Sequence, residues 1–221
     1  MKRILLSVIL ALPLLASCTI IPNRMVLNPD ETSWFTEAPY IITEHKYSSI
    51  GEEMPAWVIA YIDGGIAEVE ALTAYQSCHV FVARNEGNNF SAMKRWMEGF
   101  STGLDFPRLA AARVEARFYS AAPLPDQEYG AYFEALVRTA SDYPWTGAVR
   151  TDDFWIRKNY LPAGEEGERE AWEFLILLNI DRMIFFSQLE TVFRNVEPNP
   201  LPAKDQINAY NRVKERFYDG F

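Results

Sequence analysis

The most regular hydrophobic pattern of the chain lies between residues 170 and 180. Apolar side chains there occupy alternate positions on one face and also the central positions of the other: Trp172, Phe174, Ile176, Leu178 and Ile180 on the first face, Leu175 and Leu177 on the second. Alternation with period two is typical of a strand. A strand that is apolar on both faces belongs in the middle of a sheet, so we predict a central strand here.

Two further segments are predicted to be strands. Residues 77–84 alternate and are rich in β-branched and aromatic types, and residues 148–160 alternate with a slip near Asp152–Asp153 that predicts a β-bulge. The polar loop 161–168 joins the second of these strands to the strand at 170–180, which predicts a hairpin. One long buried helix over 172–193 is the alternative, because a short apolar run fits either period. Asp181, in the middle of that run, favours a strand followed by a helix.

Helical periodicity and turn residues account for most of the remaining chain. Pro55 suits the first turn of a helix, Gly64–Gly65 end it, and Asp105, Asp126 and Asp181 are predicted N-terminal caps. Helices are expected over 52–62, 66–72, 90–100, from 105 to Pro123, from 126 to Asp142, from 181 to 196, and around 207–217. The predicted fold is α+β: a small, mainly antiparallel sheet with strands near 77–84, 148–160 and 170–180, and helices packed against it. Residues 41–221 form one domain.

The N-terminus carries a short basic start, an apolar run and a cysteine. Lys2 and Arg3 precede the apolar run 4–15, and Leu15-Ala16-Ser17-Cys18 follows. The run is too short to span a bilayer. This segment resembles the bacterial lipoprotein signal, with residues 1–17 as the signal peptide. The resemblance implies that Cys18 receives a diacylglyceryl group and an N-acyl (palmitate-type) chain. The alternatives are an ordinary signal peptide with a chance cysteine and a short membrane helix.

Residues 18–40 are predicted to be a lipidated tether. Pro22, Asn28-Pro29-Asp30 and Pro39 interrupt any regular pattern, and 22 extended residues reach roughly 70 Å. Thr19, rather than Asp, follows the cysteine. By the sorting rule of many bacterial lipoproteins, this resembles an outer-membrane destination. We therefore expect an outer-membrane protein, facing the periplasm or exposed at the surface.

Charge and composition narrow the range of functions that the protein is expected to have. Cleavage before Cys18 leaves 204 residues, with 19 basic and 30 acidic side chains, a net charge of −11. An acidic surface repels nucleic acid, so nucleic-acid binding is not expected. An apolar content of 49% indicates a packed core. No second run of 18 uncharged apolar residues follows, which leaves the lipid as the expected membrane anchor.

The side chains capable of catalysis do not form a recognisable motif. His45, His79 and Cys78 are the available soft or imidazole donors, and the last two lie on opposite faces of a predicted strand, so we expect no metal site and no cofactor beyond the Cys18 lipid. Cys78 is expected to be a small buried residue, with a reactive thiol as the alternative. The acidic pairs that would serve a glycosidase are Glu52–Glu53, Asp152–Asp153 and Glu165–Glu166, with Asp63 as a further candidate.

Two tryptophans are candidates for ligand binding. Most aromatic residues share helix or strand faces with aliphatic residues, which indicates a core. Trp145 and Trp155 are exceptions, because Arg150, Arg157 and Lys158 lie close to them in sequence. We predict a candidate binding groove formed by Trp145, Trp155 and Arg157.

A looser resemblance rests on the order of elements between residues 55 and 196. Its markers are Pro55-x-Trp57, Val80-Phe81-Val82, an alanine-rich helix at 110–116, and two strands carrying Trp155 and Trp172–Leu178. This order is similar to the twenty-kilodalton membrane-associated lipoprotein family, whose domain recurs in flagellar assembly protein T. The chain departs from that family in its longer helical insertions before the hairpin. The resemblance implies an envelope role without known catalysis. The functional residue of the family that it carries over to this chain is the lipidated cysteine, Cys18.

Taken together, the sequence predicts a non-enzymatic, lipid-anchored envelope protein that binds a protein partner or assembles at the membrane. A periplasmic hydrolase acting on cell-wall glycan or peptide is the alternative. A cleft with two facing carboxylates about 5–10 Å apart would favour the hydrolase. A filled core with a shallow apolar surface patch would favour the binding protein.

Overall fold

A computed structural model describes residues 20–21, 24–27, 34–121, 127–161 and 169–196. Its centre is an antiparallel sheet of four main strands in the order β4-β6-β7-β5, to which the two-residue β1 adds at the β4 edge. The strands are β1 (Ile20–Ile21), β4 (Tyr40–His45), β5 (Cys78–Gly87), β6 (Val149–Tyr160) and β7 (Arg169–Asp181). With six α-helices packed against this sheet, the predicted α+β class is confirmed.

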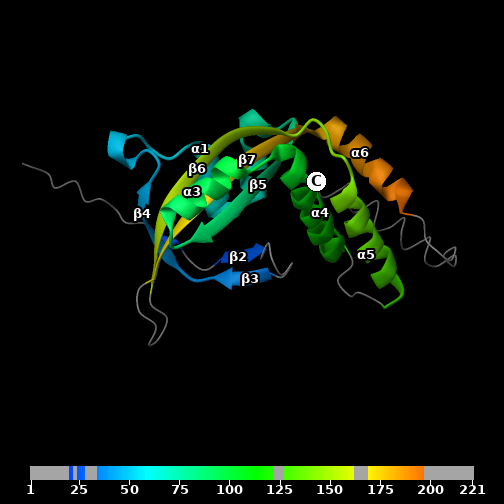
Figure 1. The fold of residues 1–221 in the computed structure, drawn as a ribbon, viewed down its shortest axis with the longest axis horizontal. Coiled ribbons are helices and arrows are strands. Elements are labelled where there is room, and N and C mark those ends of the chain that lie inside the picture. The colour runs from blue at the N-terminus through cyan, green and yellow to red at the C-terminus, as the bar shows by residue number, and fades with distance from the viewer. Residues whose placement is uncertain (1–19, 22–23, 28–33, 122–126, 162–168, 197–221) are drawn as a thin grey trace, which may run out of the picture.

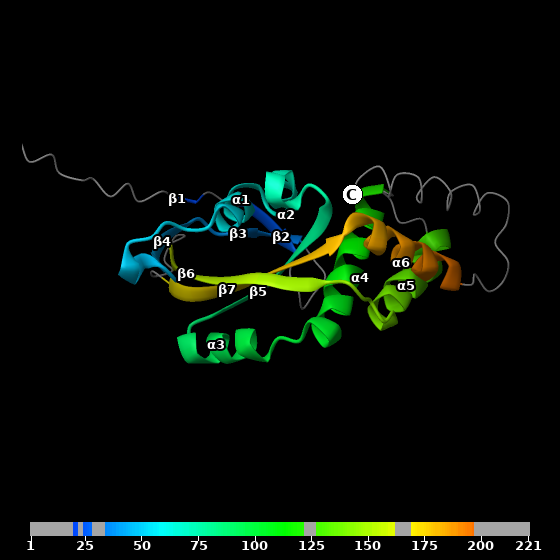
Figure 2. The same cartoon turned by 90° about the horizontal axis from the view of Figure 1, so that it is seen from above.

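Helices cover both faces of the sheet and one of its ends. Figure 2 shows α1 and α2 on one face and α3 on the other, while α4, α5 and α6 gather at the end remote from β4. The α-helices are α1 (Ala56–Gly64), α2 (Ile66–Ala71), α3 (Phe90–Gly99), α4 (Thr102–Ala121), α5 (Gln127–Asp142) and α6 (Arg182–Asn195), with 3-10 turns at Ser48–Ile50 and Thr73–Tyr75.

The predicted hairpin forms as β6 and β7, and β7 is the central strand. It pairs with β6 on one side and with β5 on the other, and Ile176 and Leu177 are both fully buried. The register shifts between Arg150 and Asp152, which confirms the predicted bulge. Asp181 caps α6 by accepting hydrogen bonds from the backbone N–H groups of Met183 and Ile184. The alternative of one long helix over 172–193 is therefore wrong.

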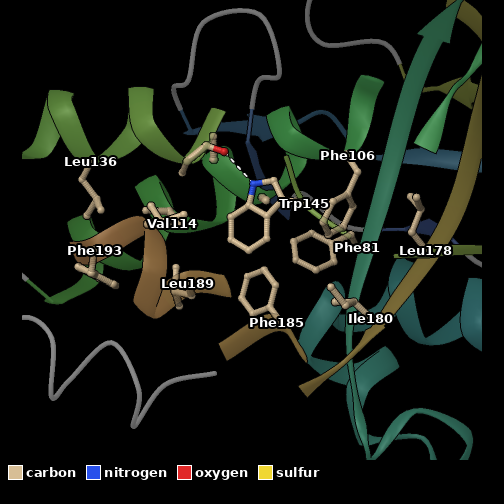
Figure 3. Packing of buried hydrophobic residues seen from close by; sticks show 14 of the residues in the cluster. Phe81, Phe106, Val114, Leu136, Trp145, Leu178, Ile180, Phe185, Leu189 and Phe193 are labelled. Carbon is tan, nitrogen blue, oxygen red and sulfur yellow. Dashed lines mark hydrogen bonds between the residues drawn. The ribbon is translucent and has the colours of Figure 1, made fainter. Parts of the chain in front are cut away.

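The sheet separates two hydrophobic clusters. One lies between the sheet and α4, α5 and α6, and includes Ile176 together with Phe81, Phe106 and Phe185, the last three of which are labelled in Figure 3. The other lies under α1 and α2, and includes Trp57, Val58, Leu175 and Leu177. Because β7 alternates, its apolar residues contribute to both clusters. Burying one such side chain stabilises the fold by about 1.5–3 kcal/mol.

The structure adds strands that the sequence did not predict. Strand β4, just after Pro39, pairs with β6 from Tyr40 opposite Tyr160 to His45 opposite Ile156. Within the predicted tether, β1 pairs with β4, and β2 (Arg24–Leu27) pairs with β3 (Trp34–Glu37) as a separate ladder (Figure 1). The prolines in this region thus interrupt strands without preventing short ones. The helix expected around 207–217 lies outside the described residues.

Element ends differ from the predictions by a few residues. Helix α1 begins at Ala56, with Pro55 as its N-terminal cap residue instead of a first-turn residue. Helix α4 begins at Thr102, and the Asp105 carboxylate accepts the Ser101 N–H at 2.8 Å from within the first turn. Strand β5 continues past the predicted end at residue 84 to Gly87, because residues 85–87 also pair with β7.

Ile176 provides a test of the central strand. Ile176→Ala should lower the free energy of unfolding by about 2–5 kcal/mol, because it removes buried methyl groups and leaves a cavity. Val149→Ala is the matched control, since Val149 is an aliphatic strand residue that is 54% exposed. Its effect should stay below about 0.5 kcal/mol. Urea denaturation of both variants measures the difference, and equal losses would contradict the central position of Ile176.

Candidate functional site

Trp145, a member of the predicted groove, lies in the core. Its indole N–H donates to the Ala140 carbonyl at 2.8 Å, and its ring stacks on Phe185 with centroids 5.0 Å apart (Figure 3). The side chain is 8% exposed. A stacked and hydrogen-bonded indole in this position holds the segment before β6 against α6, and it presents almost no surface to a ligand.

Trp155 and Arg157 lie together on the face of the sheet that α3 covers. Phe90 of α3 points its edge at Trp155 and at Trp172, with centroids 5.4 and 4.8 Å apart. The Arg157 guanidinium lies 5.2 Å from the centroid of Trp172 and pairs with Glu170 at 2.6 Å. The structure therefore brings two of the three predicted groove residues together and places Trp145 among different rings. A binding role for Trp155 and Arg157 stays a prediction.

The opposite face of the sheet carries a buried charged cluster that the sequence did not reveal. Lys158 of β6 is fully buried, and its Nζ lies 2.7 Å from a Glu173 carboxylate oxygen of β7 and 3.3 Å from Glu86 of β5. Arg84 of β5 pairs with Glu173 at 2.9 Å. The Lys158 ammonium also lies 4.2 Å from the centroid of the Tyr40 ring. We call Lys158, Glu173, Arg84, Glu86 and Tyr40 the sheet charge cluster.

In the sheet charge cluster, the carboxylates and the cations neutralise each other's charge. Each carboxylate in it contacts at least one cation, and each cation contacts at least one carboxylate. A charge without a partner at this depth would cost several kcal/mol, and pairing offsets that cost. The cluster therefore fixes how β4, β5, β6 and β7 align. No sequence-based prediction covered these buried charges; the signal that could have found them is their occurrence at inward positions of the alternation.

A second polar network closes the outer edge of β5. At Val80, the backbone N–H donates to the Glu70 carboxylate at 2.7 Å and the carbonyl accepts from the Arg113 guanidinium at 2.6 Å. Arg113 also donates to both Glu70 oxygens, at 2.9 and 3.1 Å. Glu70 comes from α2 and Arg113 from α4. One ion pair thus joins two helices to the sheet edge and satisfies backbone groups that another strand would otherwise bind.

His79 adjoins this network and is fully buried. Its ring lies edge-on to Phe185 and Phe186, with centroids 5.2 and 5.1 Å away, and its Nδ1 is 3.5 Å from a Glu70 oxygen. Burial lowers the pKa of His79, and the neighbouring Glu70 only partly offsets this. Burial by itself raises the pKa of Glu70, but His79, Arg113 and the Val80 N–H outweigh it and lower the pKa to about 2.

The bulge carboxylates Asp152 and Asp153 are engaged in structural contacts. Asp152 accepts the indole N–H of Trp57 at 2.8 Å, which ties α1 to β6. Asp153 pairs with Lys46 and with Arg150, each at 2.9 Å. Burial raises the pKa of Asp153, but these two cations outweigh it and keep the pKa below its ordinary value. Among the other candidate acids, Glu52, Glu53 and Asp63 are exposed, and Glu165–Glu166 lie outside the described residues.

The candidate metal donors do not form a cluster in the part of the chain that the structure describes. No group of three His, Cys, Asp or Glu side chains there has a geometry suited to a metal ion. Cys78 is partly buried rather than fully buried, and its thiol lies 3.8 Å from the Ser77 hydroxyl. His45 stacks on Phe154, with centroids 5.9 Å apart.

Among the described helices, none combines the length and the apolar character needed to cross a bilayer.

Exposed apolar side chains gather where β6 begins and α6 begins. Val149, Met183 and Ile184 are 54%, 77% and 44% exposed. Ile184 lies so close to Gly147 that a Cβ at that glycine would be 3.0 Å from its Cγ2. Val149 pairs with Asn179, two residues before the cap of α6, so the three residues lie at the same end of the sheet, where β6 begins and β7 ends. We call them the distal apolar patch.

Models of known families, curated proteins and solved structures give no match to this chain.

The Glu70 network predicts a pH dependence of stability. Because the folded pKa of Glu70 lies below its ordinary value of 4.5, its contribution is present above about pH 4.5 and is lost as the pH falls toward 2. Glu70→Gln should cost about 3 kcal/mol at most at pH 7, and the difference from wild type should shrink over that window. Urea denaturation at several pH values measures it. Glu68→Gln, on the exposed side of the same helix, is the control, and a Glu70→Gln cost independent of pH would contradict the assignment.

Proposed function

We propose that this protein is a lipid-anchored bacterial envelope protein with a non-enzymatic role in binding or assembly. The observation that carries the proposal is Leu15-Ala16-Ser17-Cys18 placed directly after an apolar run that is too short to span a bilayer. The Cys18 thiol is the nucleophile that accepts the diacylglyceryl group, and small residues before it leave the backbone accessible to a peptidase. Thr19 favours the outer membrane.

The described domain supports a binding role more than a hydrolytic one. The carboxylates at the bulge and in the sheet charge cluster hold helices and strands in place through ion pairs, and this use competes with a role as catalytic acid or base. The distal apolar patch offers three exposed aliphatic or thioether side chains at one end of the sheet. An apolar surface of this kind suits a protein partner with an apolar surface of its own, and the acidic charge of the chain disfavours nucleic acid.

The anchor is tested by Cys18→Ala. The variant should accumulate as an unprocessed precursor that carries no lipid, because the acceptor thiol is gone. Metabolic labelling with a fatty acid and the mass of the protein report both effects. Separation of inner and outer membranes should place the wild type in the outer-membrane fraction. A lipid-labelled mature product from Cys18→Ala would refute the anchor, and a wild type confined to the inner membrane would refute the sorting.

The binding role is tested by photo-crosslinking in intact cells. A photoreactive amino acid at Met183, within the distal apolar patch, should give a discrete protein adduct, because this side chain is 77% exposed and apolar. The same amino acid at Glu190, which is exposed on the same helix but outside the patch, is the matched control. Adduct sizes and yields from gel analysis measure the contact. Equal or absent adducts at both positions would count against the patch as a binding surface.

A further inference from the structure

The short strand β1 lies very close in sequence to the proposed lipid site. Ile20 pairs with Ile41, and Ile21 pairs with Tyr40. Only Thr19 stands between Cys18 and Ile20. Two residues span at most about 7 Å, even when they are fully extended. The position of β1 in the sheet therefore limits how far the domain can lie from an acyl chain on Cys18.

The pairing of β1 selects one end of the sheet. Successive ladders place Ile21 opposite Tyr40, Tyr40 opposite Tyr160, and Tyr160 opposite Arg169. This row runs across β1, β4, β6 and β7 where β6 ends and β7 begins. We call it the anchor end. Strand β1 runs toward the row, so Cys18, three residues before Ile21, is linked to it by at most about 11 Å of chain. In both Figure 1 and Figure 2, β4 lies at one end of the molecule and α4, α5 and α6 lie at the other.

We propose that the anchor end faces the bilayer and that the domain stands on the membrane by this end, with the distal apolar patch directed away from it. The proposal rests on the proposed lipidation of Cys18. In this arrangement the effective link is Cys18–Thr19 rather than the whole of 18–40. The partner surface is the lipid headgroup layer that surrounds the Cys18 acyl chains.

The charges of the anchor end are compatible with a nearby headgroup layer. Arg157 pairs with Glu44 at 3.6 Å and with Glu170 at 2.6 Å, and Arg169, 65% exposed, pairs with Glu86 at 3.3 Å. Carboxylates and guanidinium groups compensate each other there. The mature chain as a whole carries a charge of −11, which disfavours broad contact of its surface with anionic headgroups. Contact limited to the end nearest Cys18 agrees with both facts.

The opposite end lies far from the anchor. Strand β6 runs from Val149, next to the distal apolar patch, to Tyr160 in the anchor end. At about 3.3 Å per residue, its 12 residues place the two ends roughly 36 Å apart. The distal apolar patch is then accessible to a partner in the periplasm or at the surface, beyond the headgroup layer.

Energy transfer to lipid-bound acceptors tests this orientation. The full-length lipidated protein, with Cys78→Ser to remove the other thiol, is labelled at Ala38→Cys beside the anchor end or at Ser187→Cys on α6, both exposed positions. The proteins are reconstituted into phosphatidylethanolamine–phosphatidylglycerol vesicles that carry headgroup acceptors. Transfer from position 38 should be several-fold more efficient than from position 187. Equal efficiencies would overturn the orientation.

A longer link provides the matched control. A flexible Gly-Ser insertion of about 20 residues between Thr19 and Ile20 has an average span of roughly 25 Å. It should lower the transfer from position 38 toward that from position 187. Unchanged transfer would mean that the domain adheres through its own surface, which overturns the role of the short link.

The mass of the reconstituted protein separates the two proposals. If Cys18 carries no lipid, the proposed function and the orientation both fall. If Cys18 is lipidated and the two labels transfer equally, only the orientation falls.

Discussion

The burial of β7 on both faces is the constraint on which the rest of the domain depends. A strand with Ile176 and Leu177 both fully buried needs neighbours on its two edges and cover on its two faces. Strands β5 and β6 supply the edges, while α1 and α2 cover one face and α3 together with α4 to α6 covers the other. Because side chains alternate along the strand, a slip of one residue would exchange the two cores. The register is therefore fixed by the central strand.

The outer strand β5 shows how polar groups complete a sheet that apolar packing has positioned. Its unpaired edge would expose backbone groups of Val80, and unpaired edges invite strand addition. Glu70 and Arg113 occupy those groups from two different helices. The same ion pair keeps a carboxylate charged in a partly buried place, which explains the depressed pKa of Glu70. The Glu70–Arg113 ion pair therefore both protects the edge of β5 and attaches α2 and α4 to it.

The local features of this fold could be predicted from the sequence, while the long-range features could not. The alternation at 170–180, the bulge at Asp152 and the cap at Asp181 each depend on residues a few positions apart. Strand β4 was missed because Pro39 and its neighbours resemble a linker, and β4 becomes a strand through pairing with β6, more than a hundred residues away. Trp145 was misjudged because nearby charges suggested a surface, whereas its partner Phe185 lies 40 positions along the chain.

The candidate site was less predictable than the fold for a related reason. Glu173 and Lys158 look like solvent-facing strand residues, yet they are 2% and 0% exposed and bind each other across β6 and β7. Their inward positions in the alternation are a local signal of burial, but no local pattern shows that the two charges pair with each other. Such a pair adds little net stability, but removal of one partner leaves a buried charge that costs several kcal/mol. It therefore specifies one alignment of the strands.

The position of these charges gives the two ends of the sheet different characters. Along the inward face of β7, Leu177 and Leu175 lie in the apolar core, and Glu173 follows them into the sheet charge cluster next to the anchor end. Apolar packing would tolerate small adjustments there, but ion pairs with defined distances and aromatic contacts to Tyr40 do not. An end of the sheet whose strands are fixed in this way is suited to transmit the position of the proposed Cys18 anchor to the whole domain.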